Sequence, residues 1–444
     1  MNIKNKLMLF CMGVLVLALV TIGVRLVARQ VLVKKLNIDN ALTQIILFDK
    51  PNLQKNIPIV KEKIIDWAKI YPFTDEENSK QTADKNKFTF TKSEESALQK
   101  DIVRWSTDNF MMYDYWVECG YDFKRLIDFS ILPTGNEKVQ QLNDGYYVYT
   151  YNRHDMTEYA ASIARLDDFA KENGAKFCYV NIVRKKNKFA DTELNGIDYT
   201  NDNADELLEK LKARGIDTLD FREYTKNLSP SEYHALFYRT DHHWRASTAI
   251  LAAGIIIDKL ESLGITVDKS HFNVNDYEEK LYPKAYLGSQ GSKLKLSRNL
   301  YDDISLYYPK FPTNVHIEVP SFEINENSDF SVLYNRQQVK EADLTGKLDY
   351  HVYMYSDNPL TKVDNFNINS SQKVLVIRDS FTDTMGPFLA MGLAHVTFLD
   401  IRAFTGSVQT FIKELQPDVI IVAYSSMVGG GINWNNHRDL FDFR

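Results

Sequence analysis

Short, almost wholly apolar runs alternate with amphipathic segments from about residue 156 to the end of the chain. The amphipathic segments carry apolar residues at helical spacing, and several end at a glycine, as helices commonly do. They predict helices at 156–174, 203–215, 246–264 and 408–416. The apolar runs have the length of buried strands and predict strands at 175–183, 216–221, 373–380, 395–399 and 418–424. The alternation predicts an α/β domain with a parallel sheet covered by helices on both faces.

Residues 265–370 interrupt this alternation. They are rich in Tyr, Asn, Asp and Ser, and they lack long apolar runs. We expect them to form a partly β insertion within an α/β domain at 131–444, and insertions of this kind often shape a substrate site. We expect residues 36–130 to form a separate juxtamembrane region, interrupted by a polar loop.

An uncharged apolar run at 7–24 follows Lys4 and Lys6 near the start of the chain. As a helix, its 18 residues would span about 27 Å, which is close to the thickness of a bilayer core. A cleaved signal peptide is the alternative, but no small-x-small cleavage motif follows the run. We therefore expect an uncleaved transmembrane anchor at 1–35, with the main domain on the extracytoplasmic side. The basic residues that follow the run do not support this orientation, which rests on the nature of the main domain.

Composition restricts the partners and the covalent cross-links. The net charge of −6 argues against a nucleic-acid-binding protein, which usually carries a basic surface. The three cysteines are Cys11, Cys119 and Cys178, and Cys11 belongs to the apolar N-terminal run. At most one disulfide, between Cys119 and Cys178, is therefore possible. Because Cys178 lies in a predicted buried strand, we favour two free thiols.

The stretch KVLVIRDSFTD at 373–383 places Ser380 directly after a predicted buried strand. Ligand sites in open α/β sheets lie at the carboxyl ends of the strands. A helix that begins after Ser380 would direct its N-terminus toward developing negative charge, as a nucleophile requires. The alternative is that Ser380 only caps this helix.

The stretch RTDHHW at 239–244 contains two of the nine histidines in the chain. In an extended segment, residues two apart point the same way, so the Asp241 carboxylate can orient the imidazole of His243. His242 would then point away, and the two adjacent histidines would not share a metal ion. A structural alternative is a polar turn before a buried helix, with Trp244 as its apolar anchor.

Taken together, the two stretches contain the parts of a serine triad. His243 would take the proton of Ser380, and Asp241 would orient the imidazole and stabilise its charged form. The order of triad residues along the chain differs between unrelated folds, so the order Asp, His, Ser is no objection.

The motifs carry a resemblance to a known family. YRTDHHWRAS, DFAKENGAKFCYVNIV, YLGSQGSKLKLSRNLYDDISLYYPK and VLVIRDSF resemble the DHHW family of bacterial extracytoplasmic proteins. That family is related to the SGNH-hydrolase-like O-acetyltransferases of alginate biosynthesis. The resemblance implies a circularly permuted SGNH-like α/β domain, in which Asp241 and His243 precede Ser380.

The resemblance also suggests further site residues. Arg402 is the best match for an arginine that follows the serine, and it would bind an oxyanion or a sugar. A salt bridge to Asp400 or Asp379 is the alternative for Arg402. Gly288 and Ser289, from the insertion, are candidates for a backbone oxyanion donor.

A basic run, RKKNK at 184–188, and a glycine-rich stretch at 427–436 remain outside the triad. The basic run either lies on a solvated surface or, if it lies beside a cleft, attracts an acidic polymer. The glycine-rich stretch lacks the Lys-Ser/Thr of a phosphate-binding loop, so it is better interpreted as a loop near the sheet edge.

The resemblance implies acetyl transfer to a cell-envelope or extracellular polysaccharide through Ser380, His243 and Asp241, with no metal or organic cofactor. A multi-spanning membrane acyltransferase would supply the acetyl group outside the cytoplasm. A polysaccharide acetylesterase with the same triad is the first alternative. A non-catalytic glycan-binding scaffold of an export complex is the second.

Overall fold

The computed structural model describes residues 131–134, 137–191, 198–294, 296, 300–425 and 439–444. All of them belong to one compact unit, Asp114–Arg444. The predicted anchor, the juxtamembrane region and the glycine-rich stretch lie outside the described residues. Within the described ranges, no helix is long and apolar enough to cross a membrane.

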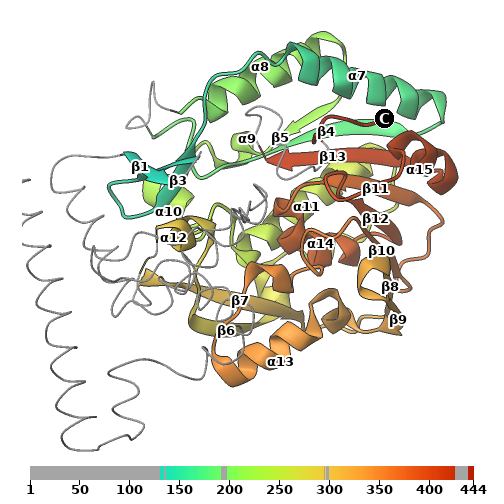
Figure 1. The fold of residues 1–444 in the computed structure, drawn as a ribbon. Helices are drawn as coiled ribbons and strands as arrows, with labels where there is room; N and C mark the ends of the chain where they lie inside the picture. The colour runs from blue at the N-terminus through green and yellow to red at the C-terminus, as the bar shows by residue number, and fades with distance from the viewer. Residues whose placement is uncertain (1–130, 135–136, 192–197, 295, 297–299, 426–438) are drawn as a thin grey trace, which may run out of the picture. The chain divides into compact units, whose positions relative to one another are not determined.

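A sheet of eight strands forms the centre of the fold, in the order β5-β4-β13-β11-β12-β10-β8-β9 (Figure 1). Its strands are β4 (Lys176–Ile182), β5 (Thr218–Asp220), β8 (Val315–Val319), β9 (Ile324–Ser328), β10 (Leu360–Asn365), β11 (Lys373–Arg378), β12 (His395–Leu399) and β13 (Val419–Ser425). The five strands that the sequence predicts, from β5 to β12 in the sheet order, pair in parallel.

The sheet is mixed, so the prediction of a parallel sheet holds for these five strands and not for the whole sheet. Strand β10 pairs antiparallel with β12, β8 pairs antiparallel with β10, and β9 pairs antiparallel with β8. All three added strands come from the predicted insertion, which extends the main sheet as well as dividing the α/β domain. The partly β character of the insertion is confirmed.

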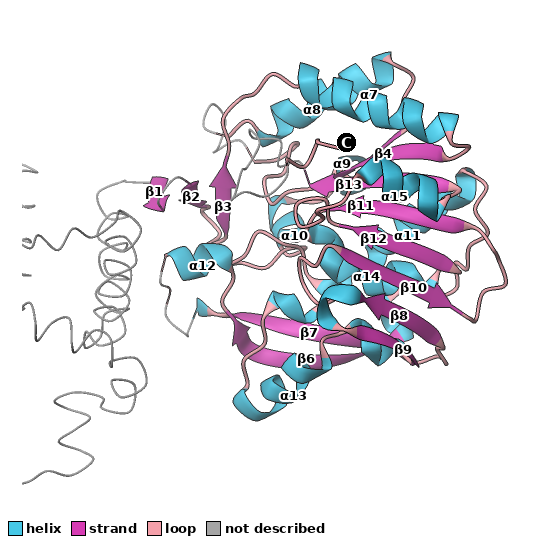
Figure 2. Ribbon diagram, turned by 45° about the vertical axis from the view of Figure 1, so that its right-hand side comes forward, coloured by secondary structure: helices cyan, strands magenta, loops and turns pink. Residues whose placement is uncertain are grey.

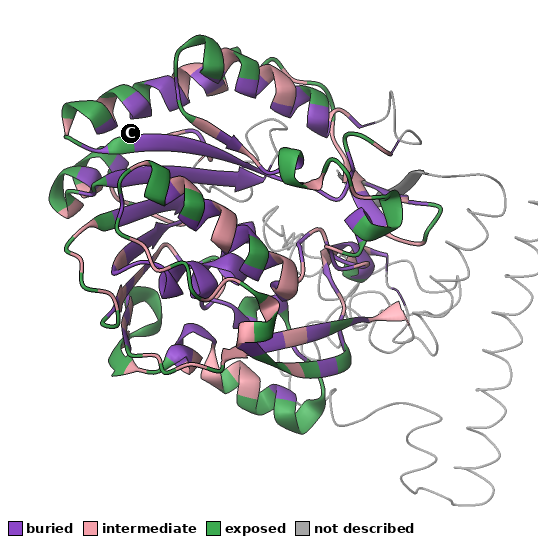
Figure 3. Ribbon diagram, turned by 180° about the vertical axis from the view of Figure 1, so that it is seen from behind, coloured by how far each residue is buried: buried purple, intermediate pink, exposed green. Residues whose placement is uncertain are grey.

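Helices cover both faces of the sheet, as predicted. Helices α7 (Thr157–Glu172), α8 (Thr200–Ala213) and α15 (Val408–Leu415) pack on one face, and α11 (Ala246–Ser262) and α14 (Phe381–Met391) pack on the other (Figures 1 and 3). Along β11, Val374 and Val376 face the core with α11 and α14, whereas Leu375 and Ile377 face the core with α7. This alternation is why the strand sequences are apolar throughout.

Smaller elements surround the sheet (Figure 2). One small antiparallel sheet contains β1 (Ile131–Thr134), β2 (Glu137–Gln141) and β3 (Tyr147–Thr150), and β6 (Tyr277–Tyr286) pairs with β7 (Asp302–Pro309) in another. The short helices are α9 (Arg222–Thr225), α10 (Pro230–His234), α12 (Ser289–Lys293) and α13 (Arg336–Thr345). Among the described residues, 3₁₀ turns lie at Val274–Asp276, Pro320–Phe322, Phe330–Leu333 and Tyr350–Val352.

Cys178 lies in β4 and is fully buried and free. Burial raises the pKa of its thiol to about 12. The prediction of a free thiol is confirmed for Cys178, whereas Cys11 and Cys119 lie outside the described residues. A protonated, enclosed thiol is a poor nucleophile, so we assign Cys178 no chemical role. It packs in the core like a small apolar side chain.

Candidate active site

Asp241 and His243 meet in a tight turn between α10 and α11. The His243 backbone N–H donates to Asp241 Oδ1 at 2.9 Å, and His243 Nδ1 lies 2.5 Å from the same oxygen. The side chain of Asp241 is buried, and its second oxygen, Oδ2, accepts from the Ser289 N–H at 2.6 Å. The carboxylate therefore holds the His243 ring by Nδ1, which leaves Nε2 for another partner.

Ser380 is that partner. The Nε2 atom of His243 lies 2.8 Å from Ser380 Oγ. Ser380 follows β11 and occupies the N-cap position of α14, which has 11 residues. Trp244 is fully buried, and its indole N–H donates to the Phe381 carbonyl at 3.0 Å. Trp244 thus ties the turn that carries the histidine to the helix that follows the serine.

The hydroxyl of Ser380 does not cap α14. Asp379 takes over this function, because its Oδ1 accepts from the Phe381 N–H at 3.0 Å. The other oxygen, Oδ2, accepts from the N–H and the Oγ of Ser425, both at 2.7 Å. Asp379 therefore ties the start of α14 to the end of β13 and leaves the Ser380 hydroxyl to His243.

Two rings enclose the imidazole of His243. Tyr350 stacks on it with 3.9 Å between centroids and 9° between planes, and the Tyr350 hydroxyl donates to the Ser380 carbonyl at 2.9 Å. His242 lies 3.8 Å from His243, centroid to centroid, at 37°. The prediction that His242 points away was wrong, because the backbone here turns and is not extended. Ser289 Oγ lies 2.9 Å from His242 Nδ1.

The electrostatics of the turn lower the pKa values of both Asp241 and His242. Burial disfavours the Asp241 carboxylate, but His242, His243 and the Ser289 N–H more than compensate and hold the pKa of Asp241 well below its usual range. Burial, together with the charges of His243 and other cations, holds the pKa of His242 well below its ordinary value, although Asp241 opposes this effect. An ionised carboxylate at Nδ1 is what a catalytic histidine requires.

Asp241, His242 and His243 also have ligand atoms within 4.8 Å of one another, the spacing that a metal ion would need. In this structure both oxygens of Asp241 accept hydrogen bonds from the protein, and both ring nitrogens of His243 lie against Asp241 and Ser380. This arrangement fits a hydrogen-bonded relay better than a metal centre, where these atoms would face the ion.

Gly288 and Ser289 contact the Asp241 turn directly. The Gly288 N–H donates to Thr240 Oγ1 at 3.0 Å, and the Ser289 N–H donates to Asp241. In this arrangement both amides donate to side chains of the turn, so the expected role of the two residues as backbone oxyanion donors stays a prediction. We assign them to holding the turn. A Cβ atom added to Gly288 would lie 2.1 Å from the Cβ of Asp241, so the two segments approach closely because Gly288 has no side chain.

We expect Gly288→Ala to displace Asp241. Overpacking of this kind should lower the free energy of unfolding by about 1–3 kcal/mol and should reduce turnover by misplacing the carboxylate. Thermal unfolding and hydrolysis of an acetyl ester measure the two effects. Ser292→Ala, at an exposed position of the same short helix, is the matched control. Unchanged unfolding and turnover in Gly288→Ala would contradict the close packing seen here.

Arg402 pairs with two carboxylates. Its Nε donates to Asp400 Oδ1 at 2.9 Å, and its Nη2 donates to Asp400 Oδ2 at 2.5 Å and to Asp357 Oδ1 at 2.8 Å. Burial opposes its charge, but the two aspartates more than compensate and raise the pKa of Arg402. The structure therefore shows the salt bridge to Asp400 that was the alternative interpretation.

Sequence patterns did not identify some supporting residues. Asp302 is buried and accepts from the Arg239 N–H and the Thr240 N–H, both at 2.8 Å. Lys185 is buried near the same turn, donates to the Arg239 carbonyl at 3.2 Å and reaches Gln290 Oε1 at 3.0 Å. Burial lowers the pKa of Lys185 to about 7. A single aspartate before a strand carries no signal for these contacts. Lys185 is only a loose match to a lysine of the related acetyltransferases, within a basic run interpreted as a solvated surface or an attraction for an acidic polymer.

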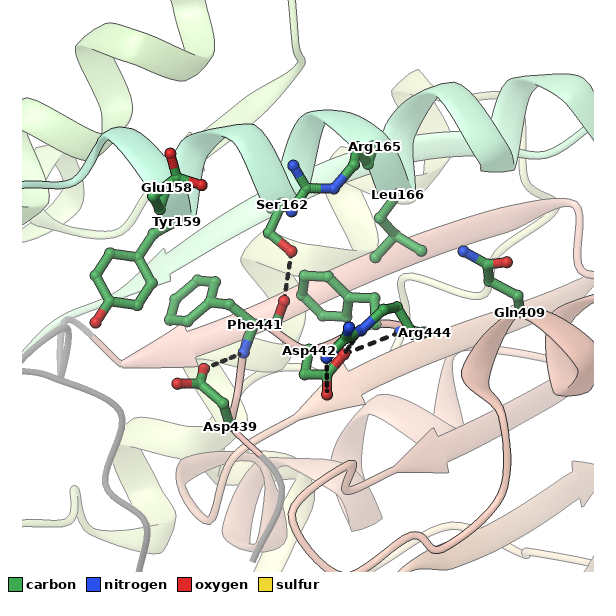
Figure 4. A pocket seen from close by; sticks show the side chains of 11 residues that line it. Glu158, Tyr159, Ser162, Arg165, Leu166, Gln409, Asp439, Phe441, Asp442 and Arg444 are labelled. Carbon is green, nitrogen blue, oxygen red and sulfur yellow. Dashed lines mark hydrogen bonds and ion pairs between the residues drawn. The ribbon is translucent and has the colours of Figure 1, made fainter.

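A pocket of about 560 Å³ lies elsewhere, between α7 and the C-terminal residues (Figure 4). Its lining includes Tyr159 and Arg165 of α7 and Phe441 near the C-terminus, and Ser162 donates a hydrogen bond to the Phe441 carbonyl. None of the three proposed catalytic residues lines it. We therefore place the candidate chemistry at the Ser380 turn.

Part of the chain matches a known protein-family model. Residues 142–293 match a family described as the SGNH hydrolase-like domain of the acetyltransferase AlgX. This span includes Asp241 and His243 and ends before Ser380. No curated protein matches the chain.

Solved structures agree with this match. The structure of Bacillus cereus PatB1 with a sulfonyl adduct has a TM-score of 0.55 and 20% sequence identity, over 71% of this chain and 99% of that chain. A DHHW family protein from Eubacterium siraeum has a TM-score of 0.51 and 17% identity, over 68% of this chain and 95% of that chain. At these identities the likeness shows the fold. The resemblance to these families is confirmed, with an SGNH-like α/β fold that contains a mixed sheet.

Proposed function

We propose that the chain is an O-acetyltransferase that modifies a cell-envelope or extracellular polysaccharide through Ser380, His243 and Asp241. The observation that carries the proposal is the continuous chain of contacts from Asp241 Oδ1 to His243 Nδ1, 2.5 Å, and from His243 Nε2 to Ser380 Oγ, 2.8 Å. The order of these residues along the chain fits a circularly permuted SGNH-like domain. The match to the AlgX-type acetyltransferase domain supports acetyl transfer as the reaction.

In the first half of the proposed reaction, Ser380 Oγ attacks the carbonyl carbon of an acetyl ester. His243 Nε2 takes the Oγ proton, and the Nδ1 proton stays on the imidazole, shared with Asp241. Negative charge develops on the carbonyl oxygen, where the N-terminus of α14 and the Ser380 N–H favour it. The bond to the donor alcohol breaks, and His243 returns the proton to that alcohol, leaving an acetyl ester on Ser380.

In the second half, a sugar hydroxyl attacks the acetyl group on Ser380. His243 takes the hydroxyl proton and passes it to Ser380 Oγ when the acyl–serine bond breaks. Water as the acceptor would turn the same steps into deacetylation, so the two functions differ only in the group that reaches the acyl-enzyme.

Location and partners form a second part of the proposal. The apolar run at 7–24 would anchor the chain in the membrane, with residues 131–444 on the extracytoplasmic side. Acetyl-CoA does not serve as a donor there, so a multi-spanning membrane acyltransferase would pass the acetyl group to Ser380.

The test combines the full chain, a chromogenic acetyl ester and a panel of oligosaccharides. Mass spectrometry of the oligosaccharides measures transfer, and free acetate measures hydrolysis. We expect acetylated oligosaccharide in the wild type and none with Ser380→Ala. Acetate alone, lost with Ser380→Ala, would identify an esterase instead. Glycan binding without turnover, equal in wild type and Ser380→Ala, would identify a non-catalytic scaffold.

A further inference from the structure

An arginine at the carboxyl end of β4 has hydrogen-bond donors that find no acceptor among the described residues. Arg184 is two residues beyond β4, and only 6% of the residue is exposed. Its Nε and Nη2 atoms are buried and have no hydrogen-bond partner among the described residues. The Tyr233 hydroxyl donates to the Arg184 carbonyl, which fixes the backbone at this point. Buried charged donors without acceptors are costly, so an acceptor is expected for them.

Two other arginines of the chain show what this acceptor would be. Nε and Nη2 form one edge of the planar guanidinium group and fit a carboxylate in a two-point contact. In Arg222, Nε lies 3.0 Å from Asp220 Oδ1 and Nη2 lies 2.8 Å from Asp220 Oδ2. Arg402 contacts Asp400 by the same two atoms. Arg184 has the same edge and is buried like Arg222, but among the described residues no carboxylate forms a hydrogen bond with that edge.

Arg184 lies beside the proposed catalytic residues. Its guanidinium carbon is 5.3 Å from the centre of the Phe381 ring and 5.4 Å from that of Tyr151. Phe381 directly follows Ser380, and its ring centre is 5.0 Å from that of His243. The charge of Arg184 also contributes to lowering the pKa of His242. The guanidinium group thus lies against two rings. Its Nε and Nη2 atoms, which have no partner among the described residues, lie near the proposed site of acyl transfer.

We propose that the Nε–Nη2 edge of Arg184 binds an acidic group, a carboxylate or a phosphate, on the polysaccharide that accepts the acetyl group. The inference rests on the proposed function and names the class of its acceptor: a glycan with acidic sugars or phosphate substituents. Both atoms are shielded from solvent, so the acidic group reaches them when neighbouring side chains move aside. Arg184 is a binding residue in this scheme and takes no part in proton transfer.

An internal partner is the competing explanation. Asp198 contacts the same neighbourhood, because its Oδ1 accepts from the Tyr151 N–H at 2.8 Å. Its Oδ2 has no hydrogen bond to any described residue and lies 3.7 Å from Lys186 Nζ. If Arg184 paired with Asp198 in solution, Arg184→Gln would lower thermal stability and leave acceptor preference unchanged.

The test measures KM for three acceptors that share one sugar backbone: a neutral oligosaccharide, the same chain with uronic acids, and the same chain with phosphate groups. The full chain is used with an uncharged acetyl ester as donor. For Arg184→Gln we expect the ratio of KM for the acidic acceptor to KM for the neutral one to rise by about 10-fold to 100-fold, as expected when a charged hydrogen-bonded pair is lost. Arg184→Lys keeps the charge but not the two-point edge, so its KM ratio should lie between those of the wild type and Arg184→Gln. Lys188→Gln removes a more exposed charge from the same loop and is the matched control.

The KM ratio is taken within each variant, so a general loss of stability does not change it. As a check without substitution at position 184, acidic oligosaccharides should stabilise Ser380→Ala against heat more than neutral ones. The acceptor with the lower KM, uronic or phosphorylated, identifies the source of the acidic group. Equal KM values for neutral and acidic acceptors, or an unchanged ratio in Arg184→Gln, would overturn the inference. Failure of the proposed function is distinct, since it would give no acetylated product with any acceptor.

Discussion

Replacing Ser380 with alanine is expected to lower kcat for hydrolysis of an acetyl ester by roughly 10⁴-fold to 10⁶-fold. The reason is that Ser380 Oγ is the atom His243 faces, at 2.8 Å, and without it no acyl-enzyme forms. His243→Ala should cost about as much, and the double variant little more, because the two residues act as a unit. Initial rates with a chromogenic ester, on protein of matched thermal stability, give the comparison.

A control separates the nucleophile from a helix cap. Ser407 caps α15 through the Thr410 N–H at 3.2 Å, so Ser407→Ala removes a serine from the N-cap position of a helix that carries none of the proposed catalytic residues. This variant should lose about 1 kcal/mol of stability and keep its turnover. If Ser380→Ala behaved like Ser407→Ala, with lower stability and normal turnover, Ser380 would be only a cap.

The second large effect is expected for Asp241→Asn. An asparagine would offer its NH₂ group to His243 Nδ1 and so favour the tautomer with the proton on Nε2. That nitrogen could no longer take the proton of Ser380, and kcat should fall by about 10³-fold to 10⁴-fold. The loss should appear at every pH from 5 to 9, because the pKa of Asp241 is held well below its usual range and the carboxylate is ionised throughout.

Asp258→Asn supplies the comparison for Asp241→Asn. Asp258 is exposed on α11, where it pairs with Lys269, so this change removes one carboxylate without touching the site. Near-normal turnover is expected for it. A fall of less than 10-fold in Asp241→Asn would contradict the proposed role of Asp241, since a wrong tautomer cannot be tolerated by a general base.

The parallel part of the sheet could be predicted because its strands are buried on both faces. The predicted range 395–399 is that of β12, and helix α11 ends two residues before the predicted 264. The antiparallel strands β8, β9 and β10 could not be placed, since β9 is mostly polar and β10 pairs with strands on both sides of it in the sequence. Their pairing depends on tertiary packing, which local sequence patterns do not encode.

The candidate site, too, could be predicted only in part. The meeting of Asp241, His243 and Ser380 was expected from the position of each residue beside a strand or a turn. The place of His242 was not, because the His243 N–H bonds the Asp241 side chain and bends the backbone, whereas an extended segment was assumed. Tyr350 comes from the insertion and stacks on His243, and no spacing in the sequence links the two.

The most direct measurement is the position at which a sulfonyl fluoride modifies the full chain. Sulfonyl fluorides react with serine hydroxyls that a neighbouring base activates, and peptide mapping by mass spectrometry identifies the modified residue. We predict a single sulfonyl group on Ser380 in the wild type, and strongly reduced modification in His243→Ala and Asp241→Asn. Modification at a different residue, or equal modification of Ser380 with and without His243, would contradict the assignment of Ser380, His243 and Asp241 as a catalytic triad.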